Sequence, residues 1–322
     1  IRRPPRSTLD RSSAASDVYK RQEMNRDKKV ILYGEDAGIS LLGQTTGLQE
    51  NFGKDRVIDT QICENIMTGM AVGLAAAGYR PICHLLYGNF IYTGFDSIAN
   101  QAAKLKYMTA GQVKLPIVYM AVIGGGRSAA AQHSDIPYPA LMNLGGVKVV
   151  VPSNSRTARG LLKSAIRDDN PVFYLTAAGG GRPEEVPDDD NYLIPIGKAE
   201  VLNKGDDVTI ISIGPMTLKA SQAAKKLNEK GVGIDLIDLL SLAPIDEDTI
   251  INSLKKTGRA VIVDEARDIC SAASHISAIL SDKAFKYLKS PIKRVTVKDV
   301  AIPYSPTLEL SLIHISEPTR PY

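Results

Sequence analysis

Three residues carry side chains that could take part in chemistry: Glu64, Phe90 and His133. Glu64 lies in IDTQICEN, where a strand pattern ends and a helix pattern begins, and open α/β sheets build their sites at this edge. A carboxylate in the first turn of a helix is also stabilised by the helix dipole, by about 0.3–1 kcal/mol. His133 in AAAQHSD equally fits an ordinary loop histidine, and Phe90 equally fits a packed aromatic. Taken one at a time, none of the three establishes a site.

Motifs of the common phosphate-binding and metal-dependent sites do not occur in the sequence. No GxGxxG follows a strand pattern, and GxxxxGKS/T, GxSxG and HExxH are absent. The run Gly124–Gly126 follows a strand pattern without a helix start behind it, so it fits a plain loop as well as a phosphate cradle. Three cysteines without CxxC spacing argue against a disulfide framework and a zinc site, and they suit a reducing compartment.

The elements that must position these residues alternate between apolar strands and helices. Near-continuous apolar strands separated by helices are typical of parallel sheets covered on both faces. Gly78 is expected to end the helix at 65–78. Ser153 or Asn154 is expected to cap the start of the helix at 156–167. The expected strands are 30–33, 57–60, 81–87, 115–123, 147–153, 171–175, 208–214, 233–240, 260–266 and 292–297, and the expected helices are 65–78, 90–108, 156–167, 217–231, 245–258 and 271–288.

The chain is long enough for two domains, because about 150 residues per domain is usual. Residues 177–197 are rich in Gly, Pro and acidic side chains and have no strand or helix pattern, which is typical of a linker or a wrapping loop. We therefore predict an α/β protein with two doubly wound domains, at 23–176 and 198–310. No apolar run approaches the roughly 18 residues of a membrane span.

The net charge of +4 belongs to one end of the chain. Residues 1–22 carry six Arg and Lys against two Asp, whereas residues 23–310 carry 32 cations and 32 anions. A neutral body favours a sister subunit and a cofactor as partners over nucleic acid or a membrane. Residues 1–22 and 311–322 both resemble translated sequencing-adapter reads, and a mitochondrial transit peptide is the alternative for the first. We expect both segments to be disordered.

Taken in order, segments of the body resemble the beta subunit of heterotetrameric 2-oxo acid dehydrogenase E1 components, the pyruvate dehydrogenase E1 beta type of the transketolase-like superfamily. The resemblance covers about residues 23–310. It implies a pyrimidine-binding domain for thiamine diphosphate and a transketolase C-terminal domain, the second serving assembly rather than catalysis. The segments that carry it are YGED, GLQENFGKDRVIDTQICEN, GLAAAGYRPIC, NFIYTGFDSIANQAAKLKYM, GQVKLPIV, AAQHSD, VVVPSNSRTARGLLKSAIRDDNPV, IPIGKAEV and VKDVAIPYSPTLE.

The resemblance implies a role for each of the three residues. Glu64 stands at the acid of the family's DTxxxE motif, which implies that it is catalytic and hydrogen-bonds N1′ of the cofactor's aminopyrimidine ring, favouring the imino tautomer. The proton affinity of a carboxyl rises in a partly buried cleft, which suits that task. Phe90 stands at the aromatic that packs on the pyrimidine ring. His133 stands at the family's QHS histidine, which is catalytic in proton transfer and in passing the acyl group to lipoamide.

The resemblance also implies a structural potassium ion. LPIV and KSAIRDDNP match the segments that hold it in the family. Backbone carbonyls supply most of its ligands, and they leave little mark on a sequence. The implied oxygen donors are Ile117, Ala165, Ile166, Asp168 and Asn170.

The chain lacks the GDG…N motif with which thiamine enzymes hold Mg²⁺ and the diphosphate. In the E1 family that motif lies on the alpha subunit. The resemblance therefore implies an alpha2beta2 heterotetramer that docks on an E2 lipoyl acyltransferase, with the alpha subunit supplying the diphosphate half of the site. We expect the chain alone to bind thiamine diphosphate poorly and to be inactive.

The match to the family loosens next to the implied substrate. His84 stands where the family usually has an acid, and Tyr87 and Gly88 replace more usual residues. Asp135 stands where Gln is more common. Pyruvate is the expected substrate, and the alternatives are branched-chain 2-oxo acids, acetoin, half of a split transketolase, or a non-catalytic assembly subunit of the same fold. The expected location is the bacterial cytoplasm, or the mitochondrial matrix if residues 1–22 are a transit peptide.

Overall fold

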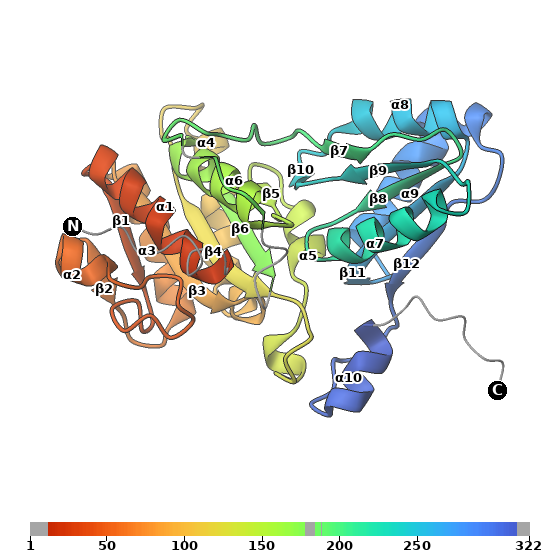
Figure 1. Cartoon of the computed structure of the whole chain (residues 1–322). Coiled ribbons are helices and arrows are strands. Elements are labelled where there is room, and N and C mark those ends of the chain that lie inside the picture. The colour runs from red at the N-terminus through yellow and green to blue at the C-terminus, as the bar shows by residue number, and fades with distance from the viewer. Residues whose placement is uncertain (1–11, 178–183, 188, 314–322) are drawn as a thin grey trace.

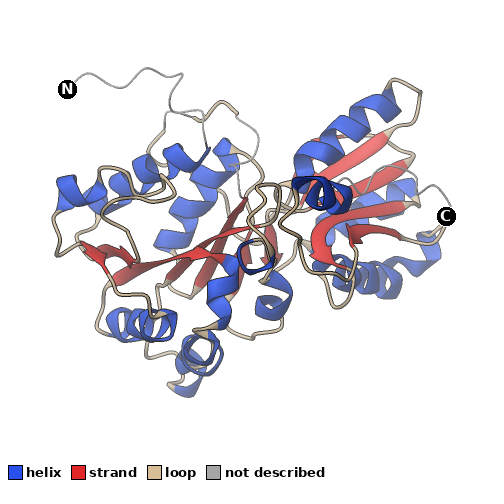
Figure 2. Ribbon diagram, turned by 90° about the horizontal axis from the view of Figure 1, so that it is seen from below, coloured by secondary structure: helices blue, strands red, loops and turns tan. Residues whose placement is uncertain are grey.

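The computed structural model describes residues 12–177, 184–187 and 189–313, which form two α/β units that lie next to each other (Figure 1). Each unit has a twisted sheet with helices on both faces (Figure 2). The prediction of two doubly wound α/β domains is thereby confirmed. Among the described residues, no helix combines the length and apolar character needed to cross a membrane.

The first sheet has seven strands, all in parallel pairs except for one antiparallel edge pair. Parallel neighbours place the carboxyl ends of their strands at one edge, where α/β proteins build their sites. The strand order is β10 (Ser241–Ala243), β5 (Lys148–Val150), β6 (Val172–Ala177), β4 (Val118–Ile123), β3 (Arg80–Tyr87), β1 (Val30–Gly34) and β2 (Val57–Asp59).

The helices of the first domain follow the expected start and stop signals. Gly78 adopts a left-handed φ of 93° just after the helix that ends at Ala76. The N–H of Thr157 donates to Asn154 Oδ1 at 2.7 Å, which caps the helix that begins at Ser155. The long helix expected at 90–108 is instead three short irregular pieces. The helical elements are α1 (Ser12–Arg26), α2 (Leu48–Phe52), α3 (Glu64–Ala76), η2 (Gly88–Tyr92), η3 (Ser97–Ala102), α4 (Leu105–Met108), η4 (Ala131–His133), α5 (Tyr138–Met142) and α6 (Ser155–Arg167).

The second sheet has five strands, with one antiparallel pair at its β7 edge. Its strand order is β12 (Lys293–Val297), β11 (Ala260–Arg267), β8 (Val208–Ser212), β9 (Ile234–Asp238) and β7 (Glu200–Asn203). The helical elements of this domain are α7 (Met216–Asn228), α8 (Glu247–Thr257), α9 (Ala272–Ala284), η5 (Phe285–Tyr287) and α10 (Pro306–Ile313). Although β10 lies between β9 and α8 in sequence, it pairs with β5, so the second half of the chain contributes a strand to the first sheet.

The expectation of disorder at the two ends is wrong for residues 12–22 and 311–313, which belong to α1 and α10. Tyr19 and Met24 of α1 are buried in the core, and the Glu23 carboxylate accepts two hydrogen bonds from Arg167 of α6 at 2.7 and 2.9 Å. The sequence did not indicate this helix because its apolar residues do not recur at helical spacing and Lys20 is fully buried. Residues 1–11 and 314–322 lie outside the described part of the chain.

Candidate functional site

The candidate site lies at the carboxyl edge of four adjacent strands of the first sheet. Glu35 follows β1, Glu64 follows β2, Phe90 follows β3 and His133 follows β4. These strands are neighbours in the order β4-β3-β1-β2, so residues that are far apart in sequence come to one edge. The structure therefore places the three residues singled out in the sequence on one side of the molecule.

Glu64 is the first residue of α3, and two tyrosines hold this helix on the sheet. Tyr33 of β1 donates its hydroxyl to Met67 O at 2.8 Å, and Tyr119 of β4 donates to Thr68 O at 3.0 Å. Both tyrosines are fully buried, and burial raises the pKa of each phenol well above its usual value. The hydroxyls therefore remain donors, and they fix the helix from which the Glu64 carboxyl extends.

The segment that carries Phe90 packs directly on the first turn of α3. Thr68 Oγ1 lies 2.9 Å from Glu64 O and 3.1 Å from Gly94 O, so one hydroxyl connects the two segments. A Cβ on Gly94 would lie 2.4 Å from Thr68 Oγ1 and 2.8 Å from Glu64 O. Only glycine allows this approach, and the helix expected at 90–108 is interrupted by a turn at this residue.

Phe90 and His133 belong to a cluster of three rings that also includes Tyr87. The ring centroids of Phe90 and His133 are 5.5 Å apart, those of Tyr87 and His133 are 4.7 Å apart, and all three pairs meet edge to face. The Arg127 guanidinium lies 5.6 Å from the Tyr87 ring centroid. Tyr87, where the sequence departs from the family, therefore contacts both Phe90 and His133.

Asn89 holds the backbone on both sides of His133. Its side-chain amide donates to Ala131 O at 3.1 Å, and its carbonyl oxygen accepts from Asp135 N–H at 3.0 Å. These two bonds bring the His133 segment to η2 and so to Phe90. Nothing in the residue type or spacing of Asn89 singled it out in the sequence beyond its place in the matched segment NFIYTG.

Glu35 adds a second carboxyl near Glu64, and sequence reasoning did not select it. Burial, then the neighbouring Asp36 and then Glu64 raise the pKa of Glu35. The signal was available, because Glu35 directly follows a buried strand whose carboxyl end meets this edge. Like charges at close range disfavour ionisation, so the Glu64 carboxylate is one cause of the raised pKa of Glu35.

His84 was expected next to the substrate, because it is one of the positions at which the sequence departs from the family. The structure instead buries it, away from the surface of the site. It is buried in β3, its Nε2 lies 2.9 Å from Gln44 Oε1, and burial lowers its pKa to about 3. Its imidazole is therefore neutral at ordinary pH. The adjacent Cys83 is also buried, and burial raises the pKa of its thiol to about 12, so this cysteine is not a nucleophile.

The five residues expected to hold potassium come together where β4 and β6 begin and α6 ends. Ile117 O accepts from Val172 N–H at 2.8 Å, and Ala165 O accepts from Asp168 N–H at 3.3 Å. Ile166 O and Asp168 O lie 3.0 and 3.1 Å from Arg80 Nη1, so these two carbonyls converge on one point. Oxygen donors of this kind suit a hard cation, although a guanidinium already contacts two of them.

Comparison with known proteins assigns both halves of this chain. Residues 10–178, more than half of the chain, match the transketolase pyrimidine-binding domain, and residues 197–317 match the transketolase C-terminal domain. The chain belongs to the transketolase-like family. The resemblance to this family that the sequence motifs indicated is therefore confirmed.

Curated members of the transketolase-like family match along nearly the whole chain. The beta subunit of acetoin:2,6-dichlorophenolindophenol oxidoreductase from Bacillus subtilis (strain 168) is 42% identical, over 94% of this chain and 92% of its own length. The pyruvate dehydrogenase E1 beta subunit of Staphylococcus epidermidis (strain ATCC 35984) is 38% identical, over 91% and 90%. The 2-oxoisovalerate dehydrogenase beta subunit of B. subtilis is also 38% identical, over 92% and 91%.

A solved structure of the same family agrees with this fold. It is described as a split-gene transketolase, inactive beta4 tetramer, and its TM-score is 0.76 at 27% sequence identity. The match covers 92% of this chain and 91% of that chain.

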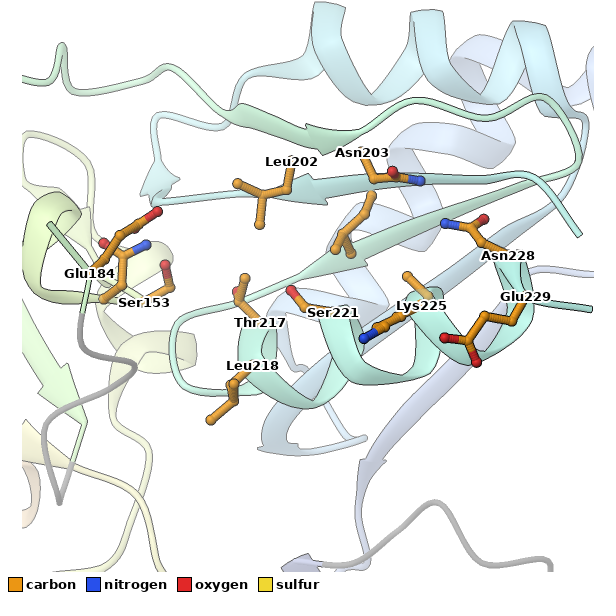
Figure 3. Close-up of a pocket in the computed structure, with 13 residues that line it drawn as sticks. Ser153, Glu184, Leu202, Asn203, Thr217, Leu218, Ser221, Lys225, Asn228 and Glu229 are labelled. Carbon is orange, nitrogen blue, oxygen red and sulfur yellow. The ribbon is translucent and has the colours of Figure 1, made fainter.

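A cavity of about 640 Å³ lies between the domains of this transketolase-like chain, away from the predicted residues (Figure 3). Ser153 lines it from the first domain, Glu184 from the segment between the domains, and Thr217, Ser221 and Lys225 of α7 from the second domain. A smaller cleft of about 320 Å³ lies beside the His133 segment. The larger cavity is therefore not the candidate site, because the aromatic cluster and Glu64 lie elsewhere. In the described ranges, no group of three or more His, Cys, Asp and Glu is placed to hold a metal ion.

Proposed function

We propose that this chain is the beta subunit of a thiamine-diphosphate-dependent dehydrogenase that decarboxylates a 2-oxo acid, with pyruvate as substrate, and passes the acyl group to lipoamide of an E2 partner. The observation that carries the proposal is the meeting of Phe90 and His133 at 5.5 Å, at the sheet edge where α3 begins with Glu64. Thiamine diphosphate, when bound, supplies the electron sink for bond cleavage.

The residues at this edge fit an aminopyrimidine ring by their chemistry. Glu64 is a half-buried carboxyl at a helix start, which can share a proton with a ring nitrogen. Phe90 offers an aromatic face or edge for packing, and Gly94 leaves room for its segment to reach α3. His133 is half-buried and able to move a proton near the reacting carbonyl. Glu35 adds a second carboxyl near Glu64, and burial, Asp36 and the Glu64 carboxyl raise its pKa.

We further propose that an alpha subunit completes the site. Ile62 and Ile66 flank Glu64 in sequence and are 70% and 68% exposed, and apolar side chains left uncovered beside a site are typical of an interface. The description of the related split-gene protein as an inactive beta4 tetramer supports the need for a second type of chain. Calorimetry with thiamine diphosphate and Mg²⁺ tests this: the isolated folded chain should bind weakly, and co-expression with a GDG…N partner should restore tight binding. Tight, Mg²⁺-dependent binding by the chain alone would refute the proposal.

Acetoin is the second candidate substrate. The 42% identity to an acetoin-oxidoreductase beta subunit exceeds the 38% identity to pyruvate and 2-oxoisovalerate relatives, and Tyr87 lies within the aromatic cluster. The assembled enzyme should be assayed with pyruvate, branched-chain 2-oxo acids and acetoin, with an artificial electron acceptor as readout. A kcat/KM for acetoin at least tenfold above that for pyruvate would replace pyruvate as the assigned substrate.

The potassium ion is proposed as a structural ligand near Asp168 and Asn170. The support is the chemistry of the backbone oxygens gathered there; Ile166 O and Asp168 O already accept from Arg80 Nη1, so the ion would share these two with the guanidinium. Replacing Na⁺ by K⁺ at constant ionic strength should raise the melting temperature by a few degrees, because a ligand bound only by the folded state stabilises it. If the melting temperature does not change, potassium does not bind there, and the Arg80 guanidinium alone satisfies the Ile166 and Asp168 carbonyls.

A further inference from the structure

The second domain reaches across to the glycine-rich segment that leads to His133. The Glu265 carboxylate at the end of β11 accepts a hydrogen bond from Gly125 N–H at 2.9 Å. The Glu309 carboxylate of α10 accepts from Gly126 N–H at 2.8 Å and from Ser128 N–H at 2.7 Å. Figure 1 places α10 below the second domain, beside the yellow-green loop of the first. Both glutamates are at least nine-tenths buried, at 9% and 2% exposure.

The backbone of this segment is held in an unusual conformation. Gly124, Gly126, Ser128 and Ala130 have φ values of 85°, 97°, 53° and 61°, so every second residue is left-handed. Such alternation points successive N–H groups into one concavity, which binds an anion. The Glu309 carboxylate occupies this concavity. Serine and alanine rarely adopt these φ values, and they persist only where surrounding contacts enforce them.

The same domain also holds the chain on the far side of His133. Arg267 of β11 pairs with the Asp135 carboxylate at 3.3 Å, and Tyr138 donates its hydroxyl to the buried Asp264 carboxylate. Within the first domain, Asn89 contributes the two bonds that flank the histidine. The backbone is therefore fixed before and after His133, mainly by residues more than 120 positions away in sequence.

We propose that Glu309 and Glu265 are positioning residues that set the conformation of the 124–133 loop and thereby place His133 for acyl transfer. The inference rests on the proposed role of His133, and it gives the second domain a part in the reaction besides assembly. Loss of the Glu309 carboxylate removes the acceptor of the Gly126 and Ser128 N–H groups and leaves a left-handed Ser128 without support, so the loop opens.

Trypsin cleavage tests the loop directly, because Arg127 is the sole Lys or Arg between residues 124 and 133 and is exposed. The full chain carrying Glu309→Ala should be cut after Arg127 at least tenfold faster than the wild type, as followed by mass spectrometry. Glu309→Gln keeps one acceptor oxygen but turns an amide donor toward an N–H group, so it should be cut at an intermediate rate. Glu229→Ala, which removes an exposed glutamate of the same domain, should be cut like the wild type.

Activity of the assembled enzyme then separates positioning from simple stability. Glu309→Ala and Glu309→Gln should lower kcat for lipoamide acylation about tenfold and threefold, with KM for the 2-oxo acid changed less than twofold. If either variant folds yet retains wild-type cleavage after Arg127, or is cut faster with unchanged acylation, the proposal is overturned. If Glu309→Ala fails to fold, Glu309→Gln decides. Full activity of His133→Ala would instead refute the proposed role of His133, whereas the cleavage rates would still report on the loop.

Discussion

Glu64 and His133 lie at the same sheet edge but are held in opposite ways. Glu64 begins a thirteen-residue helix that two buried tyrosines and Thr68 attach to the first domain's own core. His133 ends a segment with alternating left-handed residues, and three N–H groups of this segment, those of Gly125, Gly126 and Ser128, donate to carboxylates of the second domain. One group therefore depends on local helix packing, and the other on contacts between domains.

The difference teaches where each half of the site is vulnerable. A helix packed on a sheet opens only with its domain, whereas a strained loop held by a few side chains opens locally at a lower free energy. A group that shares a proton with a cofactor throughout a reaction suits the first kind of support. A group that acts when a second substrate arrives suits the second, and variants on the two sides should therefore change different properties.

The largest effect is expected from Glu64→Gln in the assembled enzyme. Removing a group that takes part in proton transfer lowers rates by about 10²–10⁴, so kcat should fall at least 100-fold. The free energy of unfolding should change by no more than about 1 kcal/mol, the size of the lost first-turn dipole interaction, because the carboxyl is half-buried and the helix is anchored elsewhere. Steady-state kinetics and urea unfolding measure the two effects.

Glu50→Gln provides the matched control for Glu64→Gln. Glu50 is also a carboxyl in the first turn of a helix, α2, and it is exposed. It should lose only the small dipole interaction of about 0.3–1 kcal/mol and none of the activity. Full activity in Glu64→Gln would mean that its carboxyl serves only as a favourable first-turn residue.

The sequence was sufficient for the features that local chemistry determines. Gly78 ends α3 and Asn154 caps α6 because a left-handed residue and an N-cap amide each satisfy helix ends on their own. Buried parallel strands read as apolar runs, so the two sheets could be predicted. The strand-to-helix position of Glu64 pointed to the sheet edge where the structure also places Phe90 and His133, whose expected roles came from the family resemblance.

The sequence was insufficient where structure depends on distant contacts. Glu309 and Gly126 are 183 residues apart, and a carboxylate that accepts backbone N–H bonds leaves no periodic or spacing signal. The short strand β10 gives no hint that it joins the first sheet rather than the second. α1 is not amphipathic, so its packing through Met24 could not be predicted from helical spacing.

The contact between the domains at Asp238 should make the free energy of unfolding depend on pH by a few kcal/mol, which distinguishes this contact from the anchor of α3. Asp238 of β9 is fully buried, accepts hydrogen bonds from Ser153 and Thr217, and has a pKa raised by burial to about 7. The folded state holds this proton above pH 4, where the unfolded state has released it, so stability falls as pH rises from 4 to 7 and then levels. Asp238→Asn removes this slope.

Urea unfolding at pH 5 and pH 8 measures the effect of Asp238→Asn. One pKa unit corresponds to about 1.4 kcal/mol, so the variant should gain about 2–3 kcal/mol relative to the wild type between these pH values. Its amide can still meet both hydroxyls, because Ser153 and Thr217 can turn to accept. Asp282→Asn, at an exposed aspartate, should show no such gain. A difference between variant and wild type that does not depend on pH would contradict the raised pKa.

Removing the two tyrosine hydroxyls tests the anchor of Glu64. Tyr33→Phe and Tyr119→Phe should each lower the free energy of unfolding by about 1 kcal/mol, the usual contribution of one hydrogen bond. The double variant should also reduce kcat several-fold, because the first turns of α3 lose their hold on the sheet. Tyr174→Phe is the matched control, since its hydroxyl donates to Ala158 O of α6 at 3.1 Å, on a helix that carries none of Glu64, Phe90 and His133. Equal loss of activity in the control would show that kcat follows stability alone.

The smallest effect is expected at Ala130, whose φ of 61° and ψ of −174° lie in a region that glycine adopts and alanine avoids. Ala130→Gly should raise the free energy of unfolding by up to about 1 kcal/mol, because relief of strain exceeds the entropic cost of about 0.5–1 kcal/mol for added glycine freedom. Ala129→Gly, at a neighbour without a left-handed φ, should instead destabilise the chain by that entropic cost. If strain in this loop helps to place His133, Ala130→Gly should stabilise the fold yet slow lipoamide acylation two- to threefold. A higher free energy of unfolding together with a lower acylation rate would show that the loop behaves differently from α3. In α3, the loss of an anchoring contact lowers stability and activity together.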